Sequence, residues 1–232
     1  MSTTTTTTTT TSSSTLKIKV CGMKILENIQ EVSMRSPDYL GFIFYKKSPR
    51  DVSTLTDLAK KVNALALPKH VKKTGVFVNA SIEEIHSKMK LWNFDALQLH
   101  GSETPEFCKK LKENYPNIEI FKVFGIKDQF DFSTLEVYED FIDYFLFDTK
   151  GPEKGGNGFV FDWSVLSDYS SKKPFILSGG IGINELEKIK QLLKTNLPVY
   201  AIDLNSKFEI NPGLKNTHQL DTFFDRLRAC LN

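Results

Sequence analysis

Short runs of β-branched and aromatic residues alternate along the chain with longer segments in which apolar residues recur at helical spacing. Eight such pairs follow residue 15, with strands predicted over 16–22, 39–44, 73–78, 96–100, 118–123, 144–148, 174–178 and 199–204. This alternation is typical of consecutive β-strand and α-helix units around a parallel sheet. The pattern therefore predicts an α/β protein.

Two helix starts are marked by their capping residues. In the segment 81–91, Ile82, Ile85 and Met89 recur at helical spacing behind a Ser81 and Glu84 capping box. Thr104-Pro105 after the fourth strand is a favourable N-cap and first-turn pair. Both boundaries support the strand, loop and helix order.

Eight units in about 217 residues favour a closed (β/α)8 TIM barrel over an open doubly wound sheet, which usually has fewer strands. No GxGxxG motif follows the first strand, so a dinucleotide-binding fold loses further support. We expect residues 16–232 to form a single barrel domain. Residues 1–15, mainly a run of Thr followed by Ser, are expected to be a disordered tail.

Charge and composition narrow the classes of partner. The formal net charge is +2 and no stretch concentrates five like charges, so neither nucleic acid nor a membrane surface is expected to bind. No apolar run approaches the roughly 20 residues that span a bilayer. The expected partner is a small molecule.

The cysteines and histidines point away from disulfides and metals. Cys21, Cys108 and Cys230 are odd in number, far apart and free of any CxxC pair, which fits a reducing, cytoplasmic location. The four histidines show no metal-ligand spacing. We therefore expect no metal site.

In a barrel of this kind the active site lies at the carboxyl ends of the strands. The polar residues predicted at those ends are Cys21, Gln98, His100, Asp148, Ser178 and Asp203. Polar side chains at the ends of otherwise apolar strands need an explanation, and chemistry is one.

Cys21 and Asp148 are the candidates for proton transfer. A thiolate at Cys21 can act as a base or nucleophile if nearby positive charge lowers its pKa, although most single cysteines are buried structural residues. Asp148 closes an apolar strand, where loss of water favours a protonated carboxyl that can act as a general acid. An Asp that merely caps the following loop is the equally acceptable alternative.

Other residues suit the binding of anions. Gly179 and Gly180 follow the seventh strand, and Asn205 and Ser206 follow the eighth, where barrels often bind phosphate. The alternative is that these glycines serve only the backbone geometry of turns. Arg50 can grip a carboxylate with two nitrogens, but a solvated arginine is favoured by the sequence alone.

Taken together, several motifs closely resemble the phosphoribosylanthranilate isomerase family. Their order and spacing, rather than any single motif, are specific, and they run from the first strand to the last helix. They are Lys19-Val20-Cys21-Gly22-Met23, Gly41-Phe42-Ile43-Phe44, Ser48-Pro49-Arg50, Gly75-Val76-Phe77-Val78-Asn79, Leu97-Gln98-Leu99-His100-Gly101, Phe147-Asp148, Gly155-Gly156-Asn157-Gly158, Phe161-Asp162-Trp163, Leu177-Ser178-Gly179-Gly180, the segment 203–209 and Pro212-Gly213-Leu214-Lys215.

The resemblance implies an Amadori rearrangement of a phosphorylated aminosugar to its ketose isomer, without any cofactor. It implies that Cys21 is the general base, Asp148 the general acid and Arg50 the holder of the anthranilate carboxylate. The resemblance places Asp203 at the sugar site, and Gly179, Gly180, Asn205 and Ser206 on the phosphate-binding turns. Gln98 and His100 are also expected to bind the substrate.

One segment departs from the family pattern. Many family members have two serines and a glycine where this chain has Asn205, Ser206 and Lys207, so the phosphate contacts there are left open.

Two other functions compete with this one. They are indole-glycerol-phosphate synthase, a barrel that uses lysine and glutamate, and a catalytically silent binding barrel. Lys19 and Lys122 lie in predicted strands, but the pair of Cys21 and Asp148 fits the isomerase better. The chain is expected to be a monomer or a homodimer.

Overall fold

The computed structural model describes residues 16–127, 129–149 and 162–231. Eight parallel strands close into one barrel in sequence order, with the last strand paired to the first. The strands are β1 Lys17–Val20, β2 Tyr39–Phe44, β3 Lys72–Phe77, β4 Ala96–Leu99, β5 Glu119–Ile126, β6 Tyr144–Thr149, β7 Phe175–Leu177 and β8 Val199–Leu204. The predicted (β/α)8 barrel is confirmed. The predicted tail, residues 1–15, lies outside the described residues.

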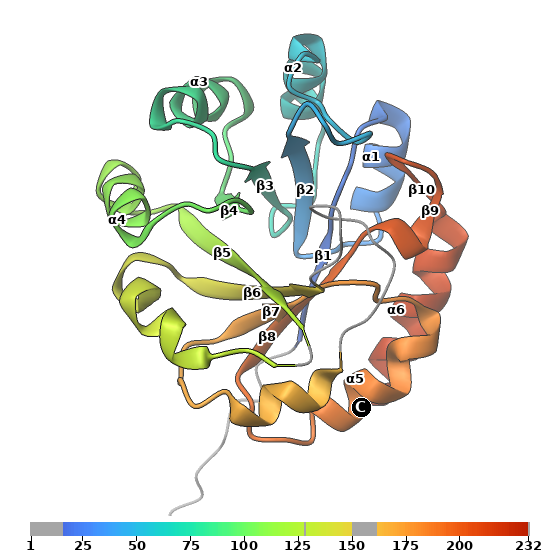
Figure 1. Ribbon diagram of the computed structural model, residues 1–232. Coiled ribbons are helices and arrows are strands. Elements are labelled where there is room, and N and C mark those ends of the chain that lie inside the picture. Colours follow the sequence, from blue (N-terminus) through green and yellow to red (C-terminus); the bar gives the residue numbers. More distant parts are fainter. Residues whose placement is uncertain (1–15, 128, 150–161, 232) are drawn as a thin grey trace, which may run out of the picture.

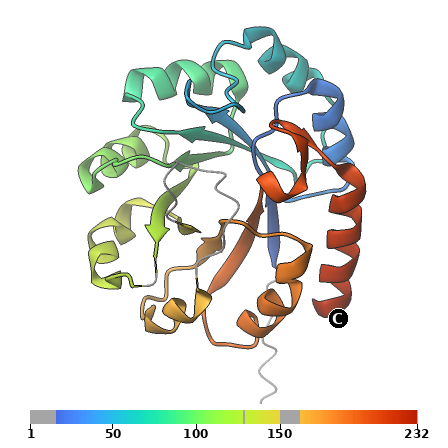
Figure 2. The same ribbon diagram turned by 45° about the vertical axis from the view of Figure 1, so that its right-hand side comes forward.

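Helices surround the barrel in the two views of Figures 1 and 2. They are α1 Leu26–Ser33, α2 Thr56–Ala64, α3 Ile82–Trp92, α4 Pro105–Asn114, α5 Leu186–Leu192 and α6 Thr217–Leu231. Short 3-10 segments complete the other units: η1 Phe132–Phe141, η2 Trp163–Asp168, η3 Ile183–Glu185 and η4 Ser206–Phe208. A small hairpin of β9 Glu209–Asn211 and β10 Leu214–Lys215 follows η4 and lies beside α1 (Figure 1).

The predicted caps are present. Ser81 accepts a hydrogen bond from the backbone N–H of Glu84, whose carboxylate in turn accepts from the backbone N–H of Ser81. Thr104 caps α4 by accepting from the backbone N–H of Phe107, with Pro105 in the first turn. These local signals therefore fix where two helices begin. No helix among the described residues is long and apolar enough to cross a membrane.

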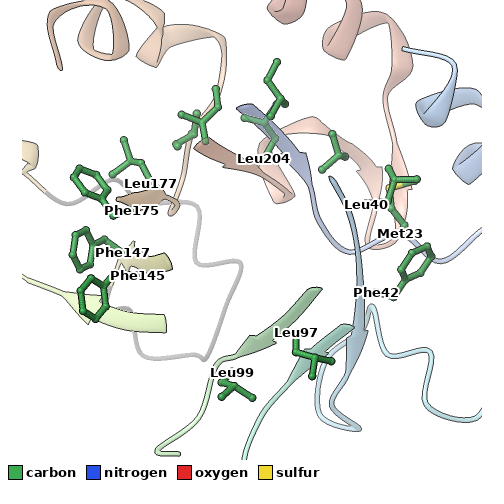
Figure 3. Close-up of a cluster of buried hydrophobic side chains, with 14 of the residues drawn as sticks. Met23, Leu40, Phe42, Leu97, Leu99, Phe145, Phe147, Phe175, Leu177 and Leu204 are labelled. Atoms are coloured by element: carbon green, nitrogen blue, oxygen red, sulfur yellow. The ribbon is translucent and has the colours of Figure 1, made fainter. Parts of the chain in front are cut away.

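Two apolar layers stabilise the barrel, one on each side of the strands. The outer layer packs the strands against the helices and includes Leu97, Leu99, Phe145 and Phe147 (Figure 3). The inner layer fills the barrel with side chains from the alternate positions: Tyr39, Ala96, Phe121, Val123, Leu146, Ile176 and Ala201. Because side chains alternate between the two faces of a strand, every second residue after an inner one also faces the barrel axis.

This alternation positions the site. Gln98 is two residues after Ala96, and Asp148 two after Leu146. Ser178 and Asp203 likewise lie two residues after the inner residues of β7 and β8. The polar positions predicted from the sequence therefore share one end of the barrel interior, the carboxyl end of the strands.

Candidate active site

Cys21 lies directly after β1 and is only 3% exposed. Its sulfur fills space that Gly41 of β2 leaves open, because a Cβ at Gly41 would lie 2.7 Å from Cys21 Sγ. The next residue, Gly22, has a φ of +78°, a conformation that side chains with a Cβ rarely adopt. The backbone therefore turns away immediately after the thiol, which stays at the barrel mouth.

Two ammonium groups and one carboxylate, those of Lys19, Lys215 and Asp203, act on this thiol. Lys19, two residues earlier on the same face of β1, is fully buried, and its Nζ lies 2.8 Å from Asp203 Oδ2. Burial raises the pKa of the Cys21 thiol, and the nearby ammonium groups of Lys19 and Lys215 only partly oppose this effect. The two cations therefore do not bring the thiol pKa below its usual value, because desolvation outweighs them.

The ammonium of Lys19 stays charged although it is buried. Burial alone would lower its pKa, but the negative charges of Asp203 and of a Cys21 thiolate outweigh burial, and the pKa is raised. Burial raises the pKa of Asp203, with Lys19 opposing and the charge of Asp148 adding to the rise. Cys21, Lys19, Asp203 and Asp148 thus form one electrostatically linked group at the mouth.

Asp148 lies in β6, near its carboxyl end, and is 8% exposed. Its Oδ2 lies 3.4 Å from Nε2 of His100, the residue that follows β4. Its Oδ1 accepts a hydrogen bond of 2.9 Å from the backbone N–H of Thr149, and a Cβ at Gly179 would lie 2.9 Å from the same oxygen. The predicted residues His100, Asp148 and Gly179 are therefore neighbours in space.

Two buried oxygens at this end have no hydrogen-bond partner within the described part of the chain. They are Oε1 of Gln98 and Oδ1 of Asp203, whose residues are 2% and 6% exposed. A buried acceptor without a donor is costly, so such atoms often face a ligand. Both oxygens can accept hydrogen bonds from sugar hydroxyl groups.

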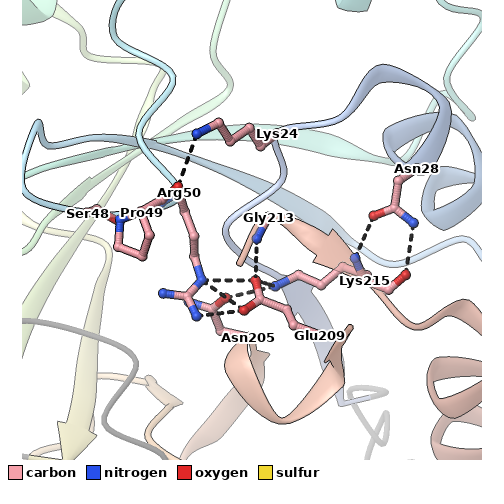
Figure 4. A network of polar contacts seen from close by, with 9 residues as sticks. All are labelled: Lys24, Asn28, Ser48, Pro49, Arg50, Asn205, Glu209, Gly213 and Lys215. Atoms are coloured by element: carbon pink, nitrogen blue, oxygen red, sulfur yellow. Dashed lines mark hydrogen bonds and ion pairs between the residues drawn. The ribbon is translucent and has the colours of Figure 1, made fainter. Parts of the chain in front are cut away.

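Arg50 lies in the loop after β2 and is 8% exposed. The prediction of a solvated arginine, which the sequence alone favoured, is therefore wrong. Its Nε donates to both carboxylate oxygens of Glu209, at 2.9 Å and 3.1 Å, and its Nη2 donates to Oε2 at 2.6 Å (Figure 4). Glu209 Oε1 also accepts from Lys215 Nζ at 2.7 Å. Burial would raise the pKa of Glu209, but Arg50 and Lys215 outweigh it and lower the pKa.

Lys215 connects this network to the turn after β8. Its Nζ donates to Asn205 Oδ1 at 2.8 Å, and its backbone N–H and carbonyl pair with the side chain of Asn28 in α1. Burial lowers the pKa of Lys215, although Glu209 opposes this. The loop after β2, the start of α1 and the end of β8 are thereby joined by one buried polar network.

The predicted phosphate-binding turns also lie at this end. Gly179 and Gly180 adopt φ angles of +92° and +67°, the left-handed region that favours glycine. Asn205 and Ser206 are half-buried, whereas Lys207 is exposed and its side chain lies beside Gly182 of the neighbouring turn. Lys207 therefore lies at the surface, close to the segment that follows β7.

Sequence reasoning did not assign a role to Lys19, Glu209 or Lys215 in the site. Charged residues are seldom fully buried, and the ion pair between Lys19 and Asp203 joins residues 184 positions apart. Lys122 is the second lysine that was considered for the rival synthase. Its Nζ lies 3.1 Å from Glu103 and donates to the carbonyl of Gly101, so its ammonium has structural partners. The glycine-rich segment 155–158 lies outside the described residues. Among the residues that the structure describes, no group of His, Cys, Asp and Glu could hold a metal ion.

Comparisons with known proteins agree with one another. A family model described as N-(5'phosphoribosyl)anthranilate (PRA) isomerase matches residues 18–226. The N-(5'-phosphoribosyl)anthranilate isomerase of Parabacteroides distasonis is 42% identical over 211 residues, covering 90% of this chain and 92% of the relative. That of Phocaeicola vulgatus is 40% identical, covering 91% and 97%.

Solved structures give the same result. The phosphoribosyl anthranilate isomerase from Thermotoga maritima is 32% identical with a TM-score of 0.78, covering 92% of this chain and 99% of that one. A phosphoribosyl anthranilate isomerase in complex with reduced 1-(o-carboxyphenylamino)-1-deoxyribulose 5-phosphate is 28% identical with a TM-score of 0.77, again covering 92% and 99%.

Proposed function

The chain belongs to the N-(5'-phosphoribosyl)anthranilate isomerase family, and we propose that Cys21 is the general base and Asp148 the general acid of its reaction. The enzyme converts N-(5'-phosphoribosyl)anthranilate into 1-(2-carboxyphenylamino)-1-deoxyribulose 5-phosphate in tryptophan biosynthesis. One observation carries the assignment of roles. Cys21 and Asp148 come from β1 and β6 but share one end of the barrel interior, with Asp203 electrostatically linked to both.

The proposed steps need only these two groups. Asp148 protonates the furanose ring oxygen, the bond from C1 to that oxygen breaks, and the nitrogen lone pair forms an iminium ion. Cys21 as thiolate then removes the proton from C2, and those electrons neutralise the iminium to give an enolamine. The enolamine gains a proton at C1 and loses one from the C2 hydroxyl, which yields the ketose.

The charges around Cys21 support its role as a base. Its thiol is buried and therefore holds its proton in the absence of substrate, but Lys19 and Lys215 provide two ammonium groups that stabilise the thiolate. A base whose charged form is stabilised by fixed neighbours needs little reorganisation when the proton moves.

The residues around this pair divide by the part of the substrate that they suit. Arg50 suits the anthranilate carboxylate, because guanidinium and carboxylate groups pair through two parallel hydrogen bonds. The free acceptors of Gln98 and Asp203 suit sugar hydroxyls, with His100 beside the acid. The turns that carry Gly179, Gly180, Asn205 and Ser206 suit the phosphate, since backbone N–H and small polar side chains match its oxygens.

A fluorescence assay tests this assignment. The wild-type enzyme should abolish the fluorescence of phosphoribosylanthranilate without producing indole absorbance, and Cys21→Ala should lower turnover by at least ~100-fold. Cys108→Ala is the matched control, because Cys108 is a buried free thiol in α4. A near-normal rate for Cys21→Ala would contradict its role, and indole formation would favour the synthase as the function.

The free thiols and a similar structure bear on location and assembly. We place the enzyme in the cytoplasm, since Cys21 and Cys108 are free thiols that suit a reducing compartment. A homodimer is one of two options, because a similar structure from Thermotoga maritima, 28% identical, comprises monomers generated from a dimeric phosphoribosylanthranilate isomerase. Sedimentation equilibrium of the purified chain distinguishes the dimer from the monomer.

A further inference from the structure

We propose that Glu209 is a positioning residue: it holds one edge of the Arg50 guanidinium so that the opposite edge binds the substrate carboxylate. This inference rests on the proposed role of Arg50 and adds to it which edge is used and what holds it. Glu209 itself does not touch the substrate in this proposal.

The bonds of Glu209 define the edge of Arg50 that is occupied. The carboxylate, with its side chain only 5% exposed, accepts from Nε and from Nη2 of Arg50. Its Oε1 accepts in addition from Lys215 Nζ and, at 3.1 Å, from the backbone N–H of Gly213. With this many partners, the carboxylate is fixed and can fix the arginine in turn.

The geometry of the guanidinium leaves one edge available. Arg carries five N–H donors in a rigid plane, and the pairing through Nε and Nη2 uses the side edge. The end edge, formed by Nη1 and the second N–H of Nη2, is not used by Glu209. Figure 4 shows this end of Arg50 pointing away from Glu209. A carboxylate approaching from that side can form two parallel hydrogen bonds.

The charges of the network favour such an anion. Two cations, Arg50 and Lys215, share the single carboxylate of Glu209, and the side chains of all three are at most 10% exposed. A buried network with one excess positive charge is costly until a second anion compensates it. The anthranilate carboxylate would supply that charge.

The same network orients the turn after β8. An ammonium group can only donate, so Asn205 must turn its Oδ1 toward Lys215 and its amide N–H groups away. Gly22 allows this arrangement, because a Cβ there would lie 2.7 Å from both Arg50 Cδ and Asn205 Oδ1. Glu209 therefore orients Arg50 directly and Asn205 through Lys215, and both side chains lie against Gly22, the residue after Cys21.

A pair of inhibitors separates this role from a purely structural one. The probes are reduced 1-(o-carboxyphenylamino)-1-deoxyribulose 5-phosphate and its phenylamino analogue, which lacks the carboxylate. Glu209→Gln adds positive charge, which favours an anion, but it releases the Arg50 guanidinium, and we expect the loss of orientation to outweigh the added charge. The inhibition constant of the carboxylated probe should rise about tenfold or more, and that of the analogue should stay within about twofold. The KM of the substrate should rise likewise, with kcat changing much less.

The controls identify which idea fails. Arg50→Lys should also raise the inhibition constant of the carboxylated probe much more than that of the analogue. Equal effects on both constants would overturn the role proposed for Arg50. Discrimination by Arg50→Lys but not by Glu209→Gln would overturn the role of Glu209 alone. Glu119→Gln removes a partly buried ion pair at the opposite end of the barrel and should change neither constant. If Glu209→Gln does not fold, Glu209→Asp replaces it, with the same selective weakening expected and equal affinities again counting against the proposal.

Discussion

Polar side chains lie at both ends of this barrel, but they differ in burial and in pairing. At the amino end of the strands, Tyr39 Oη donates to Glu119 at 2.9 Å and lies 2.8 Å from Tyr200 Oη, while Lys72 pairs with Glu119 at 2.6 Å. At the carboxyl end, Gln98 and Asp203 each keep a buried oxygen without a partner among the described residues, as Thr74 Oγ1 does in β3. Paired groups stabilise the fold, whereas unpaired acceptors at the carboxyl end are available to a ligand.

The largest expected effect is a loss of turnover on substitution of Asp148, the candidate acid at the carboxyl end of the strands. Asp148→Asn keeps the size of the side chain but removes the transferable proton, so kcat should fall by at least ~100-fold. The fluorescence assay measures this change, and a thermal melt close to that of the wild type shows that folding is intact. Turnover within a few-fold of wild type would remove Asp148 from the mechanism.

Lys19 links the stability of the barrel to its chemistry. Lys19→Met leaves Asp203 buried without its cation, which should cost about 3–5 kcal/mol of the free energy of unfolding in urea. The thiol pKa should rise as well, because Lys19 opposes the effect of burial, so kcat/KM at neutral pH should fall by about tenfold or more. Lys122→Met is the matched control, since it breaks another buried lysine pair that does not contact Cys21. Equal losses of kcat/KM in both variants would contradict a specific role for Lys19.

The pH profile of Asp148→Asn tests the same base, because the side chain at position 148 then no longer titrates. The base must be a thiolate, and burial raises the pKa of the Cys21 thiol, so the residual kcat/KM of this variant should increase with pH through the neutral range. The slope should approach about tenfold per pH unit on the acid side of that pKa. Stability follows the opposite sign, because a raised thiol pKa stabilises the fold at low pH and this contribution is lost as pH rises through the folded-state pKa. A rate that is flat from pH 6 to 8 would indicate a different base.

At the amino end, Tyr39→Phe removes one hydroxyl from the network around Glu119. The hydrogen bonds to Glu119 and Tyr200 are lost, so the free energy of unfolding should fall by about 1–2 kcal/mol. We expect kcat and KM to remain as in the wild type, measured under saturating and limiting substrate. A large loss of turnover would show that the two ends are not functionally separate.

The smallest expected effect concerns Lys207, which is exposed between the two turns assigned to phosphate. Lys207→Ser should raise KM only about two- to threefold, since an exposed charge in water contributes less than ~1 kcal/mol. The difference from the wild type should shrink at high salt because of screening. An effect that does not depend on salt would point to a change in the backbone of the turn instead.

The sequence predicts the barrel well where local signals agree. The strands 39–44 and 199–204 match to the residue, because β-branched, aromatic and other apolar residues fill most of each run. The strand predicted over 118–123 continues to Ile126, and the one predicted over 174–178 shortens to three residues. Hydrogen bonding to neighbouring strands decides such ends, and a single sequence does not contain that information.

The site was predictable in part, for a related physical reason. Cys21, Asp148 and Asp203 could be proposed because a polar side chain at the end of an apolar strand stands out. The charged partners of Asp203 and Arg50 were missed, because these ion pairs join positions 184 and 159 residues apart. Only the closed barrel brings these charges together, and the same contact explains why Arg50 is buried rather than solvated.

The position of these residues along the chain has a consequence for synthesis. Cys21 and Arg50 come from the first two units, whereas Asp203 and Glu209 come from the last, and β1 pairs with β8 to join them. A nascent chain that has not yet released its final unit from the ribosome can hold most of its helices but not this cluster of charges. Catalytic competence should therefore arise as the last step of biogenesis, and C-terminal truncation should abolish it before most secondary structure is lost.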